Sequence, residues 1–361
     1  MRILVVNAGS SSLKLRLLGE GDAPLAAADL PPGVADASLA EALDRFGRVD
    51  AVGHRIVHGG VEFRDPVIVD DGLVARIAAL GELAPLHQPA AVAALRAART
   101  ALPAVPHVAC FDTAFHARLP PAAATYALPA AWRGRFGLRR FGFHGLSHAH
   151  ASRRAAELLG RAEADVHCIT CHLGAGASLA AVRGGRSVDT TMGFTPLEGL
   201  VMATRSGSVD PGLLLWLQQR AGVAVDELAD GLEHRSGLTG LAGTADMREV
   251  LRRAAADDAA AVLARDVYVH RLSAGIAAMA AALPRVDAVV FTGGVGENAA
   301  EIRARALAGV PFLAVELDAE ANMRGSGDRV IGLAGDSSTR ALVVSSREDL
   351  EIARQVRSVL A

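Results

Sequence analysis

Cysteine, lysine and long apolar runs are scarce in this chain of 361 residues. The three cysteines, an odd number, do not make a disulfide framework. The longest apolar stretch, 274–284, falls short of the roughly 18 residues that a membrane span needs, and the apolar run at 3–6 is too short for a signal peptide. The balance of 37 Lys+Arg against 39 Asp+Glu argues against a polyanion-binding surface. We therefore expect a soluble, cytoplasmic protein with neither a membrane nor a nucleic acid as partner.

Lysine and asparagine are so rare in this chain that each position at which one of them occurs is informative. The basic residues are 36 Arg and one Lys, Lys14, and asparagine occurs three times, at Asn7, Asn298 and Asn322. The excess of arginine and alanine is typical of the codon bias of a GC-rich genome. Chance alone explains one such residue. Asn7 and Lys14, however, lie close together in the sequence, and Asn298 lies in a glycine-rich segment. These positions are therefore candidates for function.

The length and a repeated hairpin pattern indicate two related domains. Domains average about 150 residues, so 361 residues favour two of them. A β-rich run, a Gly/Ser turn and an alternating strand make 3–17 a predicted hairpin, and the same order recurs at 166–182. A third glycine-rich segment, 293–298, follows an apolar strand at 288–292 and precedes a predicted helix.

These three glycine-rich turns are candidate phosphate sites. Backbone N–H groups in such turns form concavities that bind anions. Neither hairpin has the P-loop pattern, and no G-x-G-x-x-G follows the first strand, so a dinucleotide-binding fold is disfavoured. For any one of these segments taken alone, the simplest interpretation is an ordinary turn that binds no ligand. The duplicated pair together with the third segment favours a nucleotide site formed by two related domains.

Four side chains stand at predicted strand or loop ends. Arg55 lies beside a Gly pair, and Arg205 lies in the turn-rich loop 202–212. A guanidinium suits bidentate contact with carboxylate or phosphate, although most of the 36 arginines are expected to be solvated surface groups. Asp112, at a strand end, is a candidate to hold a metal, orient a nucleophile or cap a helix. His144, just ahead of a helix, is a candidate donor to a bound oxyanion.

One cysteine motif matches a cofactor pattern by its letters alone. Residues 168–172 read C-x-x-C-H, the haem attachment pattern, and also resemble half of a zinc site. We expect no export signal, the sequence offers no second half-site, and strand alternation places Cys168 and Cys171 on opposite faces. We therefore predict buried, free cysteines.

Taken together, the motifs resemble one family, the acetate kinases. The matches run in order from residue 3 to about 355. They lie at 7–14 (NAGSSSLK), 54–60 (HRIVHGG), 111–116 (FDTAFH), 141–148 (FGFHGLSH), 192–199 (MGFTPLEG), 204–207 (TRSG) and 294–298 (GVGEN). The resemblance implies an α/β fold with two duplicated ribonuclease-H-like domains, the actin-like ATPase fold, around a cleft. It implies one domain at 1–114 plus the returning helix 349–361, and a nucleotide-binding domain at 115–348.

The resemblance also implies a reaction and a site. The reaction is reversible, direct in-line phosphoryl transfer from ATP to acetate, giving acetyl phosphate and ADP, with Mg²⁺ or alternatively Mn²⁺, in a homodimer. Asp112, His144 and Arg205 would be catalytic, and Asn7 and Glu348 would hold the metal. Arg55 would bind the acetate carboxylate, and an apolar pocket would take the methyl group: Val57, Leu86, Phe143 and Pro196. The nucleotide would contact Lys14, His172, Leu173, Gly174, Ala175, Gly176, Asp246, Met247, Arg248, Gly294, Val295, Gly296, Glu297 and Asn298.

The chemistry and two departures leave alternatives open. Acetate is already an anion, so its reaction needs charge neutralisation rather than a strong base. We therefore interpret Asp112 as a positioning group. Ala175 stands where the family usually has Asn, and Arg347 puts a cation beside Glu348. One extra methylene changes binding by only roughly 1–3 kcal/mol, so a kinase for a larger carboxylate such as propionate is one alternative. A catalytically weakened nucleotide-binding homologue is the other.

Overall fold

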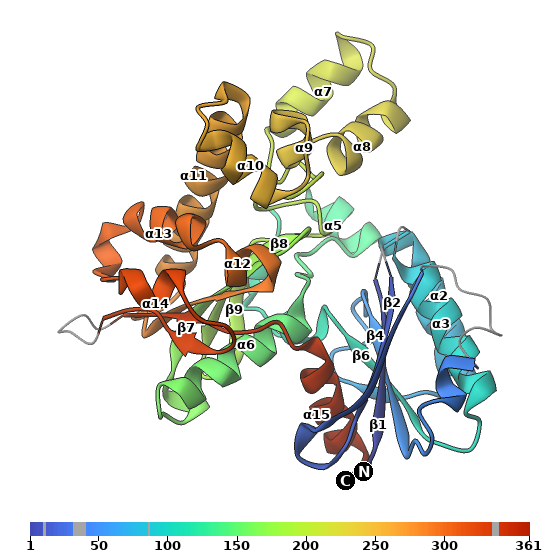
Figure 1. Cartoon of the computed structure of the whole chain (residues 1–361). Coiled ribbons are helices and arrows are strands. Elements are labelled where there is room, and N and C mark those ends of the chain that lie inside the picture. The colour runs from blue at the N-terminus through green and yellow to red at the C-terminus, as the bar shows by residue number, and fades with distance from the viewer. Residues whose placement is uncertain (10–11, 32–40, 86, 334–338) are drawn as a thin grey trace. The chain divides into compact units, whose positions relative to one another are not determined.

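The computed structural model describes residues 1–9, 12–31, 41–85, 87–333 and 339–361, which pack as two compact units (Figure 1). Unit 1 comprises Met1–Arg118, Phe143–His150 and Arg347–Ala361. Unit 2 comprises Leu119–Gly142 and Ala151–Ser346. The domain boundaries drawn from the sequence, at 114 and 348, stay a prediction.

Unit 1 is built on a six-stranded mixed sheet. Its order is β3 (Pro24–Leu30), β2 (Leu13–Leu18), β1 (Ile3–Ala8), β4 (Ala51–Ile56), β6 (His107–Phe111) and β5 (Val67–Ile68). The first three strands of the chain are antiparallel neighbours, β4 and β6 run parallel to β1, and β5 is antiparallel to β6. The central strands are buried on both faces, which explains their continuous apolar runs.

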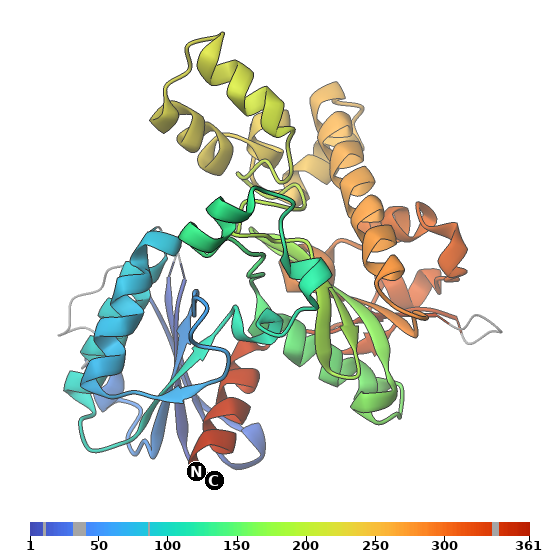
Figure 2. The same cartoon turned by 180° about the vertical axis from the view of Figure 1, so that it is seen from behind.

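Helices cover both faces of this sheet (Figures 1 and 2). The helices α2 (Asp71–Ala79) and α3 (Gln88–Ala101) pack on one face, and α15 (Glu348–Leu360) packs on the other. Gly53 in β4 allows the close approach of α15: a Cβ there would collide with Cγ2 of Ile352 and lie 2.8 Å from Cγ2 of Val356. The C-terminal helix thus belongs to the same unit as the N-terminus.

Unit 2 repeats this sheet. Its order is β9 (Arg186–Thr190), β8 (Ala177–Arg183), β7 (His167–Leu173), β10 (Ala288–Thr292), β12 (Arg340–Val343) and β11 (Arg329–Val330). Three antiparallel strands, two strands parallel to the first, and an antiparallel edge strand recur in the same order. The predicted duplication of an α/β domain is therefore confirmed.

Helices make up much of the rest of unit 2. They are α4 (Pro121–Ala124), α5 (Ala130–Phe136), α7 (Pro211–Gln219), α8 (Val225–His234), α9 (Gly237–Ala242), α10 (Met247–Ala254), α11 (Ala259–Ala281), α12 (Gly293–Asn298), α13 (Ala300–Ala308) and α14 (Ala319–Met323). The helix α6 (Gly145–Leu158) begins in unit 1 and continues into unit 2. Short 3₁₀ turns lie at Glu20–Asp22, Leu80–Leu83, Ala114–His116, Glu163–Asp165 and Pro311–Leu313. In the described ranges, no helix has the length and apolar character needed to cross a bilayer.

Two segments have structures that the sequence analysis did not identify. The described part of residues 19–48 contains the strand β3, whose side chains are all exposed or half-buried. An edge strand with this little apolar burial gives a weak sequence pattern. Residues 293–298 were expected as a loop and form the short helix α12, although glycine disfavours helices.

Candidate active site

Three predicted site residues meet at one edge of the unit 1 sheet. Asn7 lies near the end of β1, Arg55 near the end of β4, and Asp112 directly follows β6. Because these strands are parallel neighbours, their carboxyl ends lie side by side. Glu348, the first residue of α15, joins them: Asn7 Nδ2 donates to Glu348 Oε2 at 2.9 Å.

Arg55 and Asp112 form a buried two-point ion pair. The Asp112 side chain is 1% exposed and that of Arg55 is 14% exposed. To Asp112 Oδ2, Arg55 donates from Nε at 3.1 Å and from Nη2 at 2.6 Å. Its Nη1 donates to Asn7 Oδ1 at only 3.3 Å. The pair fixes one edge of the guanidinium plane, while Nη1 has capacity for a further acceptor.

The charges in this cluster are strongly coupled. Burial raises the pKa of Asp112 to about 6, with Arg55 opposing the shift and Glu348 adding to it. Burial alone would lower the pKa of Arg55, but Asp112 and Glu348 outweigh it and raise that pKa. One guanidinium and two carboxylates leave a formal charge of minus one when all three are ionised. The cluster therefore suits an additional cation.

The oxygen atoms of Asn7 and Glu348 match the donors that Mg²⁺ prefers. This ion takes hard oxygen ligands and usually keeps several waters beside one or two carboxylates and substrate phosphates. Among the described residues no cluster of three or more His, Cys, Asp or Glu could hold a metal, so a metal here would use few protein ligands. Arg347, the neighbouring cation, pairs with Asp349 through Nε at 2.9 Å and Nη2 at 2.8 Å. The residues present thus fit a jointly ligated Mg²⁺.

The start of α6 ties His144 to the backbone of Asp112. His144 has a φ of +56°, which is uncommon for a residue with a side chain. The next residue, Gly145, donates its N–H to the Asp112 carbonyl at 3.0 Å, and a Cβ at 145 would collide with that oxygen. His116 Nε2 lies 3.1 Å from the Phe143 carbonyl oxygen on the other side of His144. Glycine at 145 is therefore required for His144 to occupy this position.

The remaining predicted residues of unit 1 have different surroundings. Lys14 is exposed on β2 and pairs in register with Asn7, so the two side chains share a face of the sheet. Val57 is 4% exposed just after β4, and Phe143 is 1% exposed with its ring edge-on to His58 at 5.5 Å. Leu86 lies outside the described residues.

Two buried histidines make the stability of unit 1 sensitive to acid. Burial lowers the pKa of His58 and of His116 from 6.5 to about 4. Below pH 6.5 the unfolded chain binds protons that the folded chain does not. We expect their contribution to be complete above about pH 6.5 and to fall by about 1.4 kcal/mol per pH unit per histidine as the pH drops toward 4.

Urea unfolding across this pH range measures that slope. The variant His116→Gln keeps an amide N–H for the Phe143 carbonyl but cannot titrate. The free energy of unfolding of this variant is expected to change less steeply with pH than that of the wild type, by about 1.4 kcal/mol per pH unit. Equal slopes for the two proteins would contradict the assignment.

A cavity of about 670 Å³ in unit 2 gathers most of the predicted nucleotide ligands. Its volume lies in the range of small-molecule sites. The predicted residues that line it are Gly174, Ala175, Asp246, Met247, Arg248, Gly294, Val295 and Asn298. The sequence analysis missed the other lining residues: Ala203, Leu238, Ala245, Leu251, Tyr268 and Ala299. These come from segments far apart in the chain, which only the fold brings together.

Local contacts hold two segments of this cavity. Asp246 caps α10 by accepting the Arg248 N–H at 2.9 Å, and its carboxylate also pairs with the Arg248 guanidinium. The Ala175 carbonyl accepts the Ala203 N–H at 3.1 Å, so the hairpin tip is held through its backbone. Replacement of the family's usual Asn by Ala175 thus removes a side chain but not this anchor.

The other predicted nucleotide residues do not line the cavity. His172 and Leu173 belong to β7, and Gly176 follows at the hairpin tip. Gly296 is buried in α12, where Glu297 Oε1 accepts the Ser346 N–H at 2.9 Å. Their roles as nucleotide ligands stay predictions.

Arg205 lies in unit 2 beside Pro196 and an unpredicted carboxylate. Its Nη1 donates to the Pro196 carbonyl at 3.2 Å, and its Nε lies 3.4 Å from Glu233 Oε2. Burial lowers the pKa of Arg205, with Glu233 opposing the shift. The Glu233 carbonyl also accepts the Thr204 hydroxyl at 2.8 Å, so the end of α8 holds the loop that carries Arg205. Nothing in the sequence marked Glu233, since its partner is distant along the chain.

Gln88 is another residue that the sequence analysis did not identify. It is fully buried at the start of α3. Its Oε1 accepts the His58 N–H at 3.2 Å, and its Nε2 donates to the His58 carbonyl at 3.1 Å. Gln88 therefore holds the backbone just beyond Arg55 and Val57.

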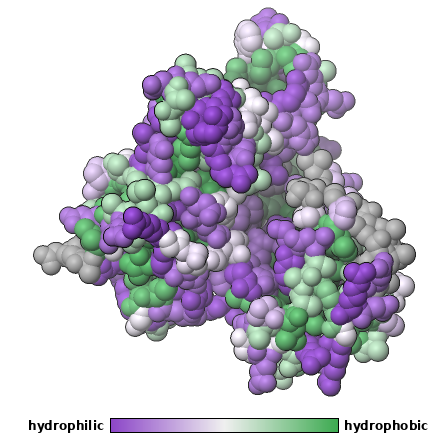
Figure 3. Space-filling view, viewed as in Figure 1, coloured by the Kyte–Doolittle hydropathy of each residue, from purple (hydrophilic) through white to green (hydrophobic). Residues whose placement is uncertain are grey.

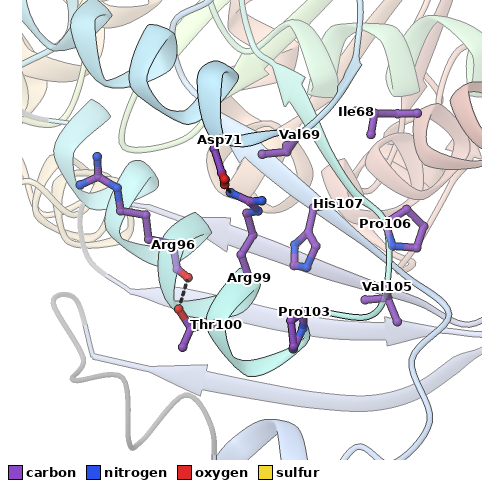
Figure 4. Close-up of a pocket in the computed structure, with 10 residues that line it drawn as sticks. All are labelled: Ile68, Val69, Asp71, Arg96, Arg99, Thr100, Pro103, Val105, Pro106 and His107. Carbon is purple, nitrogen blue, oxygen red and sulfur yellow. Dashed lines mark hydrogen bonds and ion pairs between the residues drawn. The ribbon is translucent and has the colours of Figure 1, made fainter.

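A second cavity, of about 560 Å³, lies at the opposite end of β6 from Asp112 (Figure 4). Arg99 Nη1 pairs there with Asp71 Oδ1 at 2.8 Å. Figure 4 shows the Arg96 side chain directed away from this pair. The described residues that line the cavity thus present no converging cations, and it resembles neither predicted half of the site.

Comparisons with known proteins identify the family. The acetokinase family model matches residues 33–354. The acetate kinase of Leifsonia xyli subsp. xyli is 48% identical over an alignment of 393 residues that covers 99% of each chain. Among solved structures, Porphyromonas gingivalis acetate kinase matches at a TM-score of 0.92 and 34% identity over 100% of both chains. A propionate kinase from Francisella tularensis matches at a TM-score of 0.90 and 36% identity over 98% of both chains. The chain, with its duplicated ribonuclease-H-like units of the actin-like ATPase fold, therefore belongs to the acetokinase family.

Proposed function

We propose that this protein is an acetate kinase that catalyses reversible phosphoryl transfer between ATP and acetate. The observation that carries the proposal is the buried Arg55–Asp112 pair in a chain of the acetokinase family. The pair holds the guanidinium rigidly at the carboxyl ends of parallel strands, where α/β proteins bind ligands. Its Nη1 has capacity for a further acceptor, and a carboxylate oxygen is a natural one.

In the proposed reaction an acetate oxygen attacks the γ-phosphorus of ATP. The new bond joins that oxygen to phosphorus, and the bond to the β–γ bridging oxygen breaks with its electron pair going to ADP. Arg55 holds the acetate, and Asp112 orients Arg55 rather than removing a proton, because acetate has none to lose at neutral pH. Arg205 and His144 donate to the transferring oxygens, where charge develops. Mg²⁺, held by Asn7 and Glu348 together with the phosphates, would neutralise phosphate charge.

The nucleotide half of the proposal rests on the unit 2 cavity. The α12 segment and the hairpin tip at Gly174 supply backbone N–H groups, and Asp246–Arg248 lies at the cavity wall. Lys14 contributes a cation from unit 1. The cytoplasm, where ATP is abundant, is the proposed location.

Acetate is preferred over propionate in this proposal. Val57 and Phe143 are both nearly fully buried, which favours a short alkyl group beside Arg55. The similarity to the propionate kinase from Francisella tularensis is the observation that favours propionate as a second substrate. The discrimination expected from one methylene is roughly 1–3 kcal/mol.

Hydroxylamine trapping of acyl phosphate tests the proposal. Acetate, propionate and butyrate are each supplied with ATP, with and without Mg²⁺. We expect acyl phosphate with acetate and Mg²⁺, less with propionate, and none without a divalent metal. If no acid gives acyl phosphate, the chain is a nucleotide-binding homologue that has lost catalysis.

The proposed enzyme is a homodimer, and α7 presents a surface for it. Leu213, Leu215 and Trp216 are 46%, 54% and 56% exposed, and neither α7 nor α8 has a buried residue. Figure 3 shows hydrophobic residues at the surface in this region. Exposed apolar clusters of this kind mark interaction sites.

Sedimentation velocity tests this surface. We expect the wild type to sediment as a dimer and the double variant Leu215→Glu/Trp216→Glu as a monomer, because two buried charges would be uncompensated. Gln218→Glu adds a charge to the same helix at an exposed position and should leave the dimer intact. A dimeric double variant would assign the interface elsewhere.

A further inference from the structure

Arg303 is a buried arginine whose hydrogen-bond acceptors are carbonyl oxygens. It lies in α13 and is 1% exposed. Its Nη1 donates to the carbonyls of Gly296 at 2.8 Å and Glu297 at 2.9 Å. Its Nε donates to Asn322 Oδ1 at 2.8 Å, and its Nη2 donates to the Asn322 carbonyl. Burial lowers the pKa of Arg303 to about 10, which leaves it charged at neutral pH.

Asn322 completes the arrangement from α14. It is 5% exposed, and its Nδ2 donates to the Ala300 carbonyl at 3.0 Å while its Oδ1 accepts from Arg303. Both ends of its amide are therefore used, and both bind α13, which contains Ala300 and Arg303. Asn322 is also one of only three asparagines in the chain, and none of the functions argued above uses it.

The carbonyls that Arg303 binds are those at the end of α12. A six-residue helix with three glycines has little stability of its own, and its last carbonyls have no partner within the helix. Arg303 supplies that partner. The same helix presents Gly294, Val295 and Asn298 to the 670 Å³ cavity. Arg303 thus holds the side of α12 that faces away from the ligand space.

We propose that Arg303 and Asn322 are positioning residues for the nucleotide, which fix α12 so that its backbone faces the phosphates in one geometry. This inference rests on the proposed nucleotide-binding role of α12. The guanidinium is suited to this because its planar fork reaches several acceptors at once, whereas a lysine ammonium reaches them only from a single point.

Matched variants separate positioning from folding. Asn322→Leu removes both amide contacts, and Arg303→Lys keeps the charge but loses the fork. Asn322→Asp keeps an acceptor for Arg303 Nε, adds a counter-charge for the guanidinium and loses the bond to the Ala300 carbonyl. Arg305→Lys, on the same helix in an exposed pair with Glu301, is the control.

The readouts are the Kd of Mg-ADP by calorimetry, the KM values of ATP and acetate, and the Tm, all on the full-length protein. Asn322→Leu and Arg303→Lys are expected to weaken ADP binding and raise the KM of ATP by about tenfold or more, as loss of supporting contacts does at other sites. The acetate KM should stay within about twofold, Asn322→Asp should recover most of the loss, and Arg305→Lys should match the wild type.

Two outcomes overturn the inference. One is a lowered Tm with unchanged ADP and ATP constants, which makes the residues structural only. The other is an equal rise of both substrate KM values in a folded variant. If Asn322→Leu does not fold, Asn322→Asp and Arg303→Lys decide by the same readouts. Failure of the proposed function is distinguishable, because the wild type itself would then form no acyl phosphate.

Discussion

Replacing Arg205 by alanine is expected to lower kcat by at least about 10²-fold, on the precedent of lost oxyanion donors and arginine fingers. The guanidinium is largely desolvated and held on one side by the Pro196 carbonyl and Glu233. A desolvated cation stabilises developing charge more strongly than a solvated one, and it needs no reorganisation during the reaction. The loss should therefore appear in kcat rather than in the KM of acetate.

Steady-state kinetics with two comparison variants checks this prediction. Arg205→Lys keeps the charge but not the fork, so we expect only partial recovery. Arg118→Ala removes an exposed arginine paired with Asp65 in unit 1 and should leave kcat within about twofold. Near-wild-type turnover in a folded Arg205→Ala protein would remove Arg205 from the transition state.

The second large effect is expected at the Arg55–Asp112 pair. Arg55→Ala should abolish most acetate use while leaving Mg-ADP binding nearly intact, because its proposed partner is the carboxylate. It should also destabilise unit 1 by about 3–5 kcal/mol, because Asp112 would remain buried without its counter-ion. Loss of activity in Arg55→Ala alone therefore does not distinguish unfolding of unit 1 from loss of acetate binding.

A double variant separates the two effects. Arg55→Met with Asp112→Leu replaces the ion pair by apolar side chains, which is often close to neutral for stability. We expect urea unfolding to show recovery of most of the lost stability, while acetate-dependent turnover stays absent. If activity returns together with stability, the pair has a structural role only. If Arg55→Ala leaves the acetate KM and kcat unchanged, Arg55 does not bind acetate.

Much of the fold can be predicted from the sequence because many of its strands and turns have strong local sequence patterns. The hairpin at 3–17 and its counterpart at 166–182 combine apolar alternation with Gly/Ser turns, and both appear as antiparallel pairs. The strand β3 was missed because none of its side chains is fully buried. The helix α12 was missed because tertiary contacts from Arg303, rather than intrinsic propensity, hold its end.

The site was predictable only as a set of separate motifs. Spacing and residue type identified Arg55 and Asp112, but not that they would form a two-point pair. That contact depends on the parallel register of β4 and β6, in which Gly53 lies opposite Val108, a residue far along the chain. Supporting residues such as Gln88 and Glu233 carry no local signal, because their partners are distant in the sequence. The cysteines, by contrast, are free and buried as predicted.

The origin of the oxygen that bridges carbon and phosphorus tests the central claim most directly. Acetate labelled with ¹⁸O in both carboxyl oxygens is incubated with the protein, ATP and Mg²⁺, and the product is observed by ³¹P NMR. Attack of an acetate oxygen on phosphorus predicts an acetyl phosphate resonance shifted by a directly bonded ¹⁸O. Absence of acetyl phosphate, or acetyl phosphate without that label, would contradict the account.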